Sequence, residues 1–352
     1  MNLAIRTQSP ESGDDSDSTI NRPLPQAVLT NLQSSMLSVT RNQPSYLWLG
    51  RGELEQRVQA LESLLEQCTV CPRDCRNNRL KGEIAACYSG RLPIVSSYTP
   101  HFGEEPPLIG TNGAGNIFFG NCNLRCVYCQ NYQISQTHKE QIKNEVTHER
   151  LAEMMLELQA RGCHNINFVS PTHFAPQMAR AILIAVQRGL HLPIVYNTNA
   201  YDSVEVLRLL EGIVDIYLPD LKYAENETGF LYSKVRSYRD CARRAIAEMF
   251  RQMGDELHFG KDRLLKRGLV IRLLVLPNDI AEIEKSLQWI RDELSPKTAI
   301  SLMAQYYATN KAATDYSHFF SSHVFCFLFC LPMQLSSDRH AFHVFNNGAG
   351  KG

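Results

Sequence analysis

The chain has 352 residues, 36 basic and 36 acidic side chains, and a hydrophobic fraction of 44%. This size allows one large domain with an extension, or two domains. A net charge of zero gives no electrostatic reason to expect nucleic acid or an anionic membrane as a partner. The eleven cysteines are odd in number and clustered, which argues against a secreted disulfide framework and favours metal binding.

Residues 1–45 are rich in Ser, Asp, Pro and Gln and show no clear hydrophobic period. Such a segment buries too little apolar surface to offset its ordering entropy, so we predict a disordered extension. It lacks the hydrophobic stretch of a signal peptide, and no apolar run in the chain reaches the roughly 18 residues that span a bilayer. We therefore expect a cytoplasmic protein without a membrane partner.

Residues 46–110 are predicted to form a helix followed by a metal-binding module. Leu54, Val58, Leu61 and Leu65 recur at helical spacing within 52–68. Four cysteines follow in the order CxxC-x3-C-x11-C: Cys68, Cys71, Cys75 and Cys87. They complete a tetrahedral ligand set, which suits either zinc or a second iron–sulfur cluster.

From residue 113 on, short apolar segments alternate with helical patterns. The predicted strands are 115–120, 166–170, 193–199, 213–221, 268–277 and 299–307. The predicted helices between them are 148–162, 176–189, 202–212, 238–254 and 279–294, with Asp202 and Asp279 opening the third and the last. Nearly continuous apolar strands are typical of a parallel sheet covered on both faces. Six such units predict a parallel barrel or a doubly wound sheet, with functional residues at the carboxyl ends of the strands.

Three further cysteines, Cys122, Cys126 and Cys129, follow the first of these strands in a CxxxCxxC spacing. Three thiolates can hold a 4Fe–4S cluster and leave one iron open for a substrate or cofactor. A zinc site completed by a remote ligand, such as His173 or Cys163, is the alternative.

The segment CNLRCVYCQN resembles the signature of the radical S-adenosylmethionine (SAM) superfamily, with the aromatic Tyr128 directly before the third cysteine. The resemblance covers about residues 65–307 and is nearest to the branch related to pyruvate formate-lyase activating enzyme. It implies an α/β fold with a partial (β/α)6 TIM-like barrel over 111–307. It also implies a 4Fe–4S cluster that cleaves bound SAM to a 5′-deoxyadenosyl radical for hydrogen abstraction.

Other strand ends extend the resemblance to the SAM site. YNTNAY resembles the Thr-Asn-Gly segment of the family, IYLPDLK its Asp-x-Lys strand end, and IRLLVLPN its Arg-bearing strand. With the aromatic residue of the signature, the cofactor-binding residues so implied are Tyr128, Thr198, Asn199, Asp220, Lys222 and Arg272. Arg272 can pair with the SAM carboxylate through its planar fork. The alternative for Asp220 and Lys222 is a local surface pair.

One motif of the family is missing. The Gly-Gly-Glu that usually receives the SAM amino group is replaced by FVSPTHFAP. Ser170, Thr172 and His173 are candidates there, none of them assigned to the amino group. His173 is either a general acid–base or a hydrogen-bonded structural residue.

Three functions are compatible with these patterns. The first is a radical SAM oxidoreductase that acts on a protein substrate and takes electrons from a donor such as flavodoxin or ferredoxin. The second is a radical SAM enzyme that modifies RNA or a small molecule, although the neutral charge weighs against RNA. The third is a non-catalytic iron–sulfur or zinc scaffold. Residues 308–352 form an atypical C-terminal tail, because they continue neither the strand nor the helix pattern.

Overall fold

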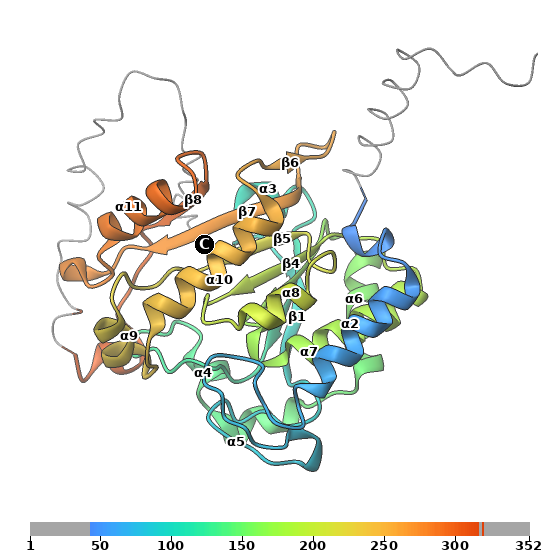
Figure 1. The fold of residues 1–352 in the computed structure, drawn as a ribbon, viewed down its shortest axis with the longest axis horizontal. Helices are drawn as coiled ribbons and strands as arrows, with labels where there is room; N and C mark the ends of the chain where they lie inside the picture. The colour runs from blue at the N-terminus through green and yellow to red at the C-terminus, as the bar shows by residue number, and fades with distance from the viewer. Residues whose placement is uncertain (1–42, 317–318, 320–352) are drawn as a thin grey trace, which may run out of the picture. The chain divides into compact units, whose positions relative to one another are not determined.

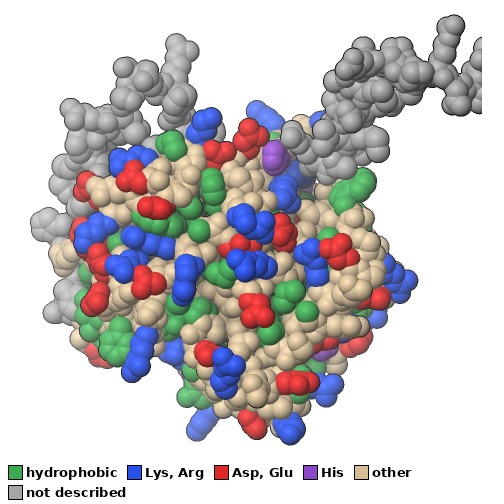
Figure 2. All heavy atoms as spheres, viewed as in Figure 1, with side chains coloured by type: hydrophobic (Ala, Val, Ile, Leu, Met, Phe, Trp, Pro, Cys, Tyr) green, Lys and Arg blue, Asp and Glu red, His purple; other side chains and the backbone are tan. Residues whose placement is uncertain are grey.

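A computed structural model describes residues 43–316 and 319. The predicted extension 1–45 lies outside these residues except for 43–45, and so does most of the predicted tail 308–352. Within the described residues, no helix combines the length and the apolar character needed to cross a membrane. Figure 2 shows basic and acidic side chains interspersed over the visible face, as the balanced composition suggests.

One eight-stranded sheet organises the described part of the chain (Figure 1). Its strands are β1 (Val95–His101), β2 (Ala114–Phe119), β3 (Ile166–Val169), β4 (Ile194–Thr198), β5 (Ile216–Pro219), β6 (His258–Phe259), β7 (Leu265–Leu274) and β8 (Ala299–Met303). The order is β1-β2-β3-β4-β5-β7, and both β6 and β8 pair with β7. The pairs from β2 through β5 to β7 and β8 are parallel, whereas β1 and β6 run antiparallel to their neighbours.

The six parallel strands are the six predicted from the sequence, and with their helices they form a partial (β/α)6 barrel. The α/β fold class is therefore confirmed. Among the described strands, β1 and β8 do not pair with each other, so the barrel stays open between these two edges.

Helices cover the outer face of the sheet. The longer ones are α2 (Arg51–Ser63), α6 (His148–Ala160), α7 (Ala175–Gln187), α8 (Val204–Leu209), α9 (Asn226–Ser233), α10 (Tyr238–Met253) and α11 (Ile283–Glu293). Three short helices lie in connecting segments instead: α3 (Pro106–Ile109) between β1 and β2, and α4 (Tyr132–Ser135) and α5 (His138–Gln141) between β2 and α6. In Figure 1, α8 and α10 lie over β4, β5 and β7. The N-terminal α2 packs on α7, where Arg180 Nε donates to Glu62 Oε1 at 2.8 Å.

The two faces of the sheet have separate apolar cores. Because side chains alternate along a strand, Val195 and Tyr196 of β4 point to opposite faces. Tyr196 belongs to the large core that includes the outer helices. Val195 belongs to a small cluster inside the barrel: Leu108, Val195, Ile216, Leu218, Leu265, Val270 and Ala299. The short α3 thus fills the amino-terminal end of the barrel and leaves the carboxyl end for a site.

Two predicted helix starts are wrong. Helix α8 begins after Ser203, and the Asp202 carboxylate instead accepts hydrogen bonds from Tyr196 Oη at 2.9 Å and from the Thr198 hydroxyl. Helix α11 begins after Glu282, because Asn278, Asp279 and Glu282 have positive φ angles that interrupt a helix. The structure also adds β1, α3 and α9, which the apolar patterns did not predict.

Candidate active site

A cavity of about 380 Å³ lies at the carboxyl ends of the strands. The nine residues predicted for the first cluster and for SAM all line it: Cys122, Cys126, Cys129, Tyr128, Thr198, Asn199, Asp220, Lys222 and Arg272. They come from the ends of β2, β4, β5 and β7, where parallel strands bring distant residues together. Cavities of this size are typical of small-molecule and cofactor sites.

The cysteine loop is anchored by main-chain hydrogen bonds to the end of α9. Arg125 N donates to Ser233 O at 3.0 Å, and Val127 N donates to Tyr232 O at 2.9 Å. On its other side, Asn123 Nδ2 donates to Tyr201 O at 3.0 Å. The loop is therefore held between α9 and the segment that follows β4.

Each thiol of the triplet has a polar neighbour. Cys126 Sγ lies 3.0 Å from Ser233 Oγ, and Cys129 Sγ lies 3.3 Å from Ser135 Oγ. Cys122 Sγ accepts from Leu124 N at 3.4 Å. Burial raises the pKa of Cys126 to about 12, although the positive charge of Lys222 opposes this shift. A thiolate at this buried position is therefore stable only beside further positive charge, which a metal centre supplies.

In the described part of the chain, the three cysteines are free and are not arranged around a single metal ion. None of the nine described cysteines forms a disulfide. Within residues 43–316 and 319, no group of three or more His, Cys, Asp or Glu side chains is arranged to hold one metal ion. The ligands of a cluster bind different irons and so lie farther apart. Neither His173 nor Cys163, the two residues suggested as a fourth zinc ligand, lines the cavity.

Arg272 is surrounded by protein oxygens. Its Nε donates to Asp220 Oδ1 at 2.6 Å, Nη2 to Asn197 Oδ1 at 2.6 Å and Nη1 to Glu104 Oε2 at 3.3 Å. Burial disfavours its charge, but the carboxylates of Asp220, Glu105 and Glu104 outweigh burial and raise its pKa. A bidentate contact with a SAM carboxylate would require Arg272 to give up some of these bonds.

Asp220 and Lys222 are not a surface pair, because their side chains are only 20% and 17% exposed and line the cavity. Lys222 Nζ donates to Asp220 Oδ2 at 3.0 Å. Burial opposes the ionisation of Asp220, but the positive charges of Arg272 and Lys222 hold its pKa below the usual value. Asp220 is therefore a carboxylate that the cavity keeps ionised.

The other predicted SAM contacts are buried polar residues at the same end of the barrel. The Thr198 hydroxyl lies 2.9 Å from the Thr172 hydroxyl, and Asn199 Nδ2 donates to Asn123 Oδ1 at 2.7 Å. Tyr128 is buried and meets Tyr223 edge-on, with 6.2 Å between the ring centres. These contacts tie the ends of β3 and β4 to the cysteine loop.

The segment that replaces Gly-Gly-Glu is divided between two places. Ser170 lines the cavity. Thr172 does not line it, and its hydroxyl contacts the hydroxyl of Thr198. His173 lies outside the cavity and lines the hollow of the N-terminal cysteines, so its predicted role as a general acid–base at the SAM site is unsupported.

Sequence patterns missed Glu104, which comes from the segment between β1 and β2. Its side chain is 8% exposed, and its Oε1 accepts from Asn116 Nδ2 at 2.8 Å. It lines the cavity opposite Arg272. No strand or helix pattern led to it, because it lies in a connecting segment.

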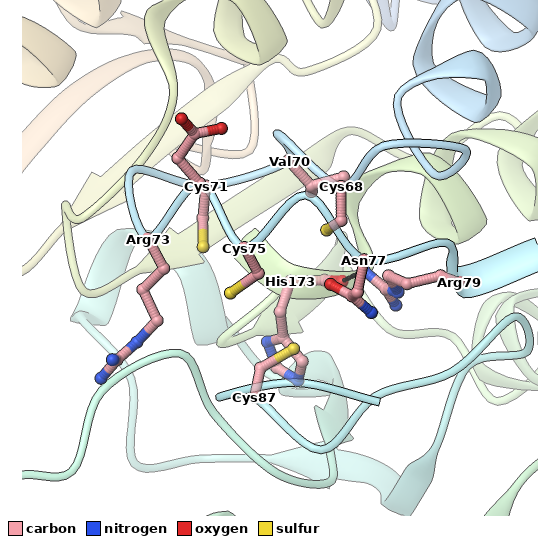
Figure 3. Close-up of a pocket in the computed structure, with 10 residues that line it drawn as sticks. Cys68, Val70, Cys71, Arg73, Cys75, Asn77, Arg79, Cys87 and His173 are labelled. Carbon is pink, nitrogen blue, oxygen red and sulfur yellow. Dashed lines mark hydrogen bonds between the residues drawn. The ribbon is translucent and has the colours of Figure 1, made fainter. Parts of the chain in front are cut away.

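The four N-terminal cysteines lie together in a second place. Cys68, Cys71, Cys75 and Cys87 line one small hollow with Arg79 and His173 (Figure 3). Cys163 and Cys241 are both buried and free.

Comparisons with known proteins identify the superfamily of this chain. The profile of the Radical SAM superfamily matches residues 116–290. "Uncharacterized protein MJ0674" of Methanocaldococcus jannaschii is 30% identical over 266 residues, which are 74% of this chain and 71% of that protein. "Uncharacterized protein MJ0808" of the same organism is 28% identical over 170 residues, which are 44% of this chain and 49% of that protein.

Among solved structures, HydG, a maturase of the [FeFe]-hydrogenase, superimposes with a TM-score of 0.38 at 12% identity. The match covers 73% of this chain and 56% of HydG. The chain thus spans about half the length of MJ0808 and of HydG. The match to MJ0674 extends over more than two thirds of both proteins, and the profile covers the strands that carry the site, so this chain belongs to the radical SAM superfamily.

Proposed function

We propose that this protein is an oxidoreductase that reductively cleaves SAM and abstracts hydrogen from a protein substrate, in the manner of pyruvate formate-lyase activating enzyme. The superfamily to which it belongs uses a 4Fe–4S cluster and SAM. The observation that carries the proposal is that three cysteines and six polar or aromatic residues, predicted from separate motifs, line one cavity.

When bound and reduced, the cluster supplies the electron that converts SAM to a 5′-deoxyadenosyl radical. The residues of the chain would hold and orient these groups. Cys122, Cys126 and Cys129 would ligate three irons and leave the fourth for SAM. Asp220 and Glu104 are the cavity carboxylates, and in the absence of Gly-Gly-Glu they are our candidates to receive the positively charged groups of SAM. Precise placement of this kind governs rate steeply.

Access for a substrate would be through the open side of the barrel. His101 of β1 and Met303 of β8 line the cavity from the two unpaired edges, together with Gln305. A small carrier such as flavodoxin or ferredoxin would supply electrons. A cytoplasmic location suits nine described cysteines that are all free.

Modification of a small molecule is a second candidate function. The charged and polar side chains that line the cavity favour this candidate. Glu104, Asn197, Asp220 and Arg272 present carboxylate, amide and guanidinium groups in one place. A few convergent polar groups are how small-molecule sites fix orientation.

Anaerobic incubation of reduced protein with SAM tests the proposed chemistry. Release of 5′-deoxyadenosine is expected from the wild type and not from Cys126→Ala, because the variant lacks a cluster ligand. Cys163→Ala is the matched control, because it removes a buried thiol away from the cavity. A wild type with a loaded cluster that neither binds SAM nor releases the nucleoside would favour the scaffold function.

Fractionated extract from the source cells distinguishes a protein substrate from RNA or a small molecule. If the substrate is a protein, the desalted macromolecular fraction should stimulate 5′-deoxyadenosine release, and protease should abolish the effect. Sensitivity to ribonuclease would indicate RNA instead. Stimulation by the low-molecular-weight filtrate alone would contradict the protein substrate and support the second candidate.

A further inference from the structure

The N-terminal cysteines surround a hollow that is separate from the SAM cavity. Figure 3 shows the sulfurs of Cys68, Cys71, Cys75 and Cys87 turned toward the same space. Three of these residues are at least 91% buried, and Cys75 is half-buried. The segment that carries them is held by its own main chain, with Cys68 N donating to Asn77 O at 2.9 Å and Arg76 N to Cys68 O at 3.1 Å. The four thiols therefore lie together because the local backbone places them there.

The size of the hollow distinguishes between zinc and an iron–sulfur cluster. Its volume is about 10 Å³, close to what one water molecule requires. Around zinc, four sulfurs lie about 2.3 Å from the metal. At that distance their van der Waals surfaces nearly meet, and no water-sized space remains. The four sulfurs therefore surround more space than a zinc ion leaves, and a cluster of several irons and sulfides is the thiolate-ligated centre that needs such space.

The spacing of the thiols agrees with this distinction. In the described part of the chain, no three His, Cys, Asp or Glu side chains are arranged as ligands of one ion. The N-terminal cysteines share this property with Cys122, Cys126 and Cys129, the cluster ligands of the superfamily. Ligands that bind different irons lie farther apart than ligands of one zinc ion, so the N-terminal set does not have the close arrangement that a single zinc ion requires.

A buried cation faces the hollow without a carboxylate partner. Arg79 is 1% exposed and lines the hollow, with Nε donating to Gly90 O at 3.0 Å and Nη1 to His173 O at 2.7 Å. Its Nη2 is buried and has no hydrogen-bond partner. Within the described residues, no Asp or Glu lies within 4.0 Å of its guanidinium. A buried charge needs an opposite charge, and a cluster core ligated by four thiolates is an anion.

His173 gives a second, independent indication that the hollow holds a ligand. It is 1% exposed and lines the hollow beside Cys87 (Figure 3). Its Nε2 lies 3.0 Å from Gly120 O, which follows β2 directly. Its Nδ1 is buried and has no hydrogen-bond partner. An unpaired nitrogen and an unpaired guanidinium N–H thus lie at the same hollow as four thiols.

We propose that Cys68, Cys71, Cys75 and Cys87 hold a second iron–sulfur cluster, not zinc, and that Arg79 is its buried counter-cation. This proposal does not depend on SAM cleavage or on the substrate of the first site. His173 connects the two sites, because its ring contacts the carbonyl of Gly120, two residues before Cys122.

Metal analysis of two reciprocal variants tests the cluster. The triple variant Cys122→Ser, Cys126→Ser, Cys129→Ser, purified anaerobically, should retain iron and inorganic sulfide in about equal amounts and contain no zinc. Adding Cys71→Ser and Cys75→Ser should remove this iron, whereas adding Cys163→Ser should not. Stoichiometric zinc in the triple variant, or no metal in it, would overturn the proposal.

A second comparison tests the N-terminal cluster even if the triple variant does not fold. The wild type should hold more iron than the Cys71→Ser/Cys75→Ser variant, which keeps all three ligands of the first cluster. Equal iron in these two proteins would contradict a second cluster.

Two substitutions at Arg79 test its role through the reduction potential of the second cluster, measured in the triple variant. Arg79→Met should make the potential more negative, because loss of a nearby positive charge disfavours the reduced, more anionic cluster. Arg79→Lys keeps the charge and should stay close to the parent. A potential that does not change in Arg79→Met would show that Arg79 is not the counter-cation.

Discussion

Inside the barrel, Arg272 lies among the carboxylates of Asp220, Glu104 and Glu105, at N–O distances of 2.6, 3.3 and 3.9 Å. The Arg272 side chain is 13% exposed, and those of Glu104 and Glu105 are 8% and 3% exposed. One guanidinium thus neutralises several buried acids. Its main structural role is to stabilise these carboxylates in the interior of the protein, where they would otherwise be unpaired.

Arg272→Ala is therefore expected to destabilise the protein as well as weaken SAM binding. Removing one partner of a buried ion pair leaves unpaired charge and typically costs about 3–5 kcal/mol. Urea denaturation of the protein without SAM measures this loss. Arg291→Ala is the matched control, because Arg291 pairs with Asp292 in solvent and its loss should leave the unfolding midpoint unchanged. If Arg272→Ala lowered SAM affinity but left the free energy of unfolding unchanged, the main role of Arg272 would be to bind SAM and not to neutralise the buried carboxylates.

Asp215 gives a prediction for pH dependence. It accepts hydrogen bonds from Ser45 N at 2.6 Å and Ile194 N at 2.9 Å. Burial nonetheless raises its pKa from 3.8 to about 6 in the folded protein. The folded state therefore binds more protons than the unfolded state between about pH 4 and pH 6. The contribution of Asp215 to stability is fully present below this window and is lost as the pH rises through it.

Asp215→Asn removes this titration. The free energy of unfolding of the wild type, minus that of the variant, should fall by about 3 kcal/mol between about pH 4 and pH 7. Urea denaturation at several pH values measures this difference, and other titrating groups cancel in the subtraction. A difference that stays constant or rises with pH would show that Asp215 is charged in the folded protein at all these values.

At the scale of elements, α9 and α10 connect the cysteine loop to the strand ends. Ser233 ends α9 and lies beside Cys126. Tyr238 begins α10, and its hydroxyl lies 2.9 Å from Asn199 O and accepts from Lys222 N at 3.0 Å. The two helices meet at Gly229, where a Cβ would overlap the Cβ of Tyr238 and lie 3.1 Å from its Cγ. The absence of a side chain at Gly229 thus sets how closely α9 packs against α10.

Gly229→Ala is expected to lower the free energy of unfolding by about 1–3 kcal/mol, because an added methyl overpacks a fixed contact. Displacement of Ser233 should also reduce iron incorporation at the first cluster, which iron analysis of reconstituted protein measures. Gly52→Ala in α2 is the control, because its Cβ would meet no atom within 4 Å and Ala is the better helix former. Its stability should equal or exceed that of the wild type. Unchanged stability and iron content in Gly229→Ala would contradict this account of the α9–α10 contact.

For the molecule as a whole, the strands of the barrel carry none of the cysteine ligands. Cys122 and Cys126 belong to the large apolar core, but they lie in the loop after β2 and not in a strand or in the apolar cluster inside the barrel. Cys126→Ala should therefore lose the iron of the first cluster and keep its far-UV circular dichroism. Any iron held by the second cluster proposed above should remain, because Cys68, Cys71, Cys75 and Cys87 lie in a separate hollow. Loss of helical signal together with iron would show that the cluster is needed for the barrel to fold.

Much of the fold follows from local pattern. The six parallel strands are largely apolar, and all six were predicted within a few residues. The antiparallel β1 was not, because Ser97, Thr99 and Pro100 give it little apolar alternation. It is a strand only because it pairs with the edge of β2. The start of α11 also depended on positive φ angles at Asn278 and Glu282, which the hydrophobic period does not report.

The sequence by itself determined the candidate ligands, since cysteine spacing is a local property and the motif stands directly after a strand. It also determined which strand ends carry polar residues. Only the tertiary structure brought Glu104 to Arg272, 168 residues away, and only packing buried Arg79 beside four thiols. Hydrophobic periodicity tells which face of an element is buried but not which distant side chains share that interior. Which distant side chains meet depends on the order of the strands in the sheet. These side chains determine the charge of the SAM cavity and of the hollow at the N-terminal cysteines.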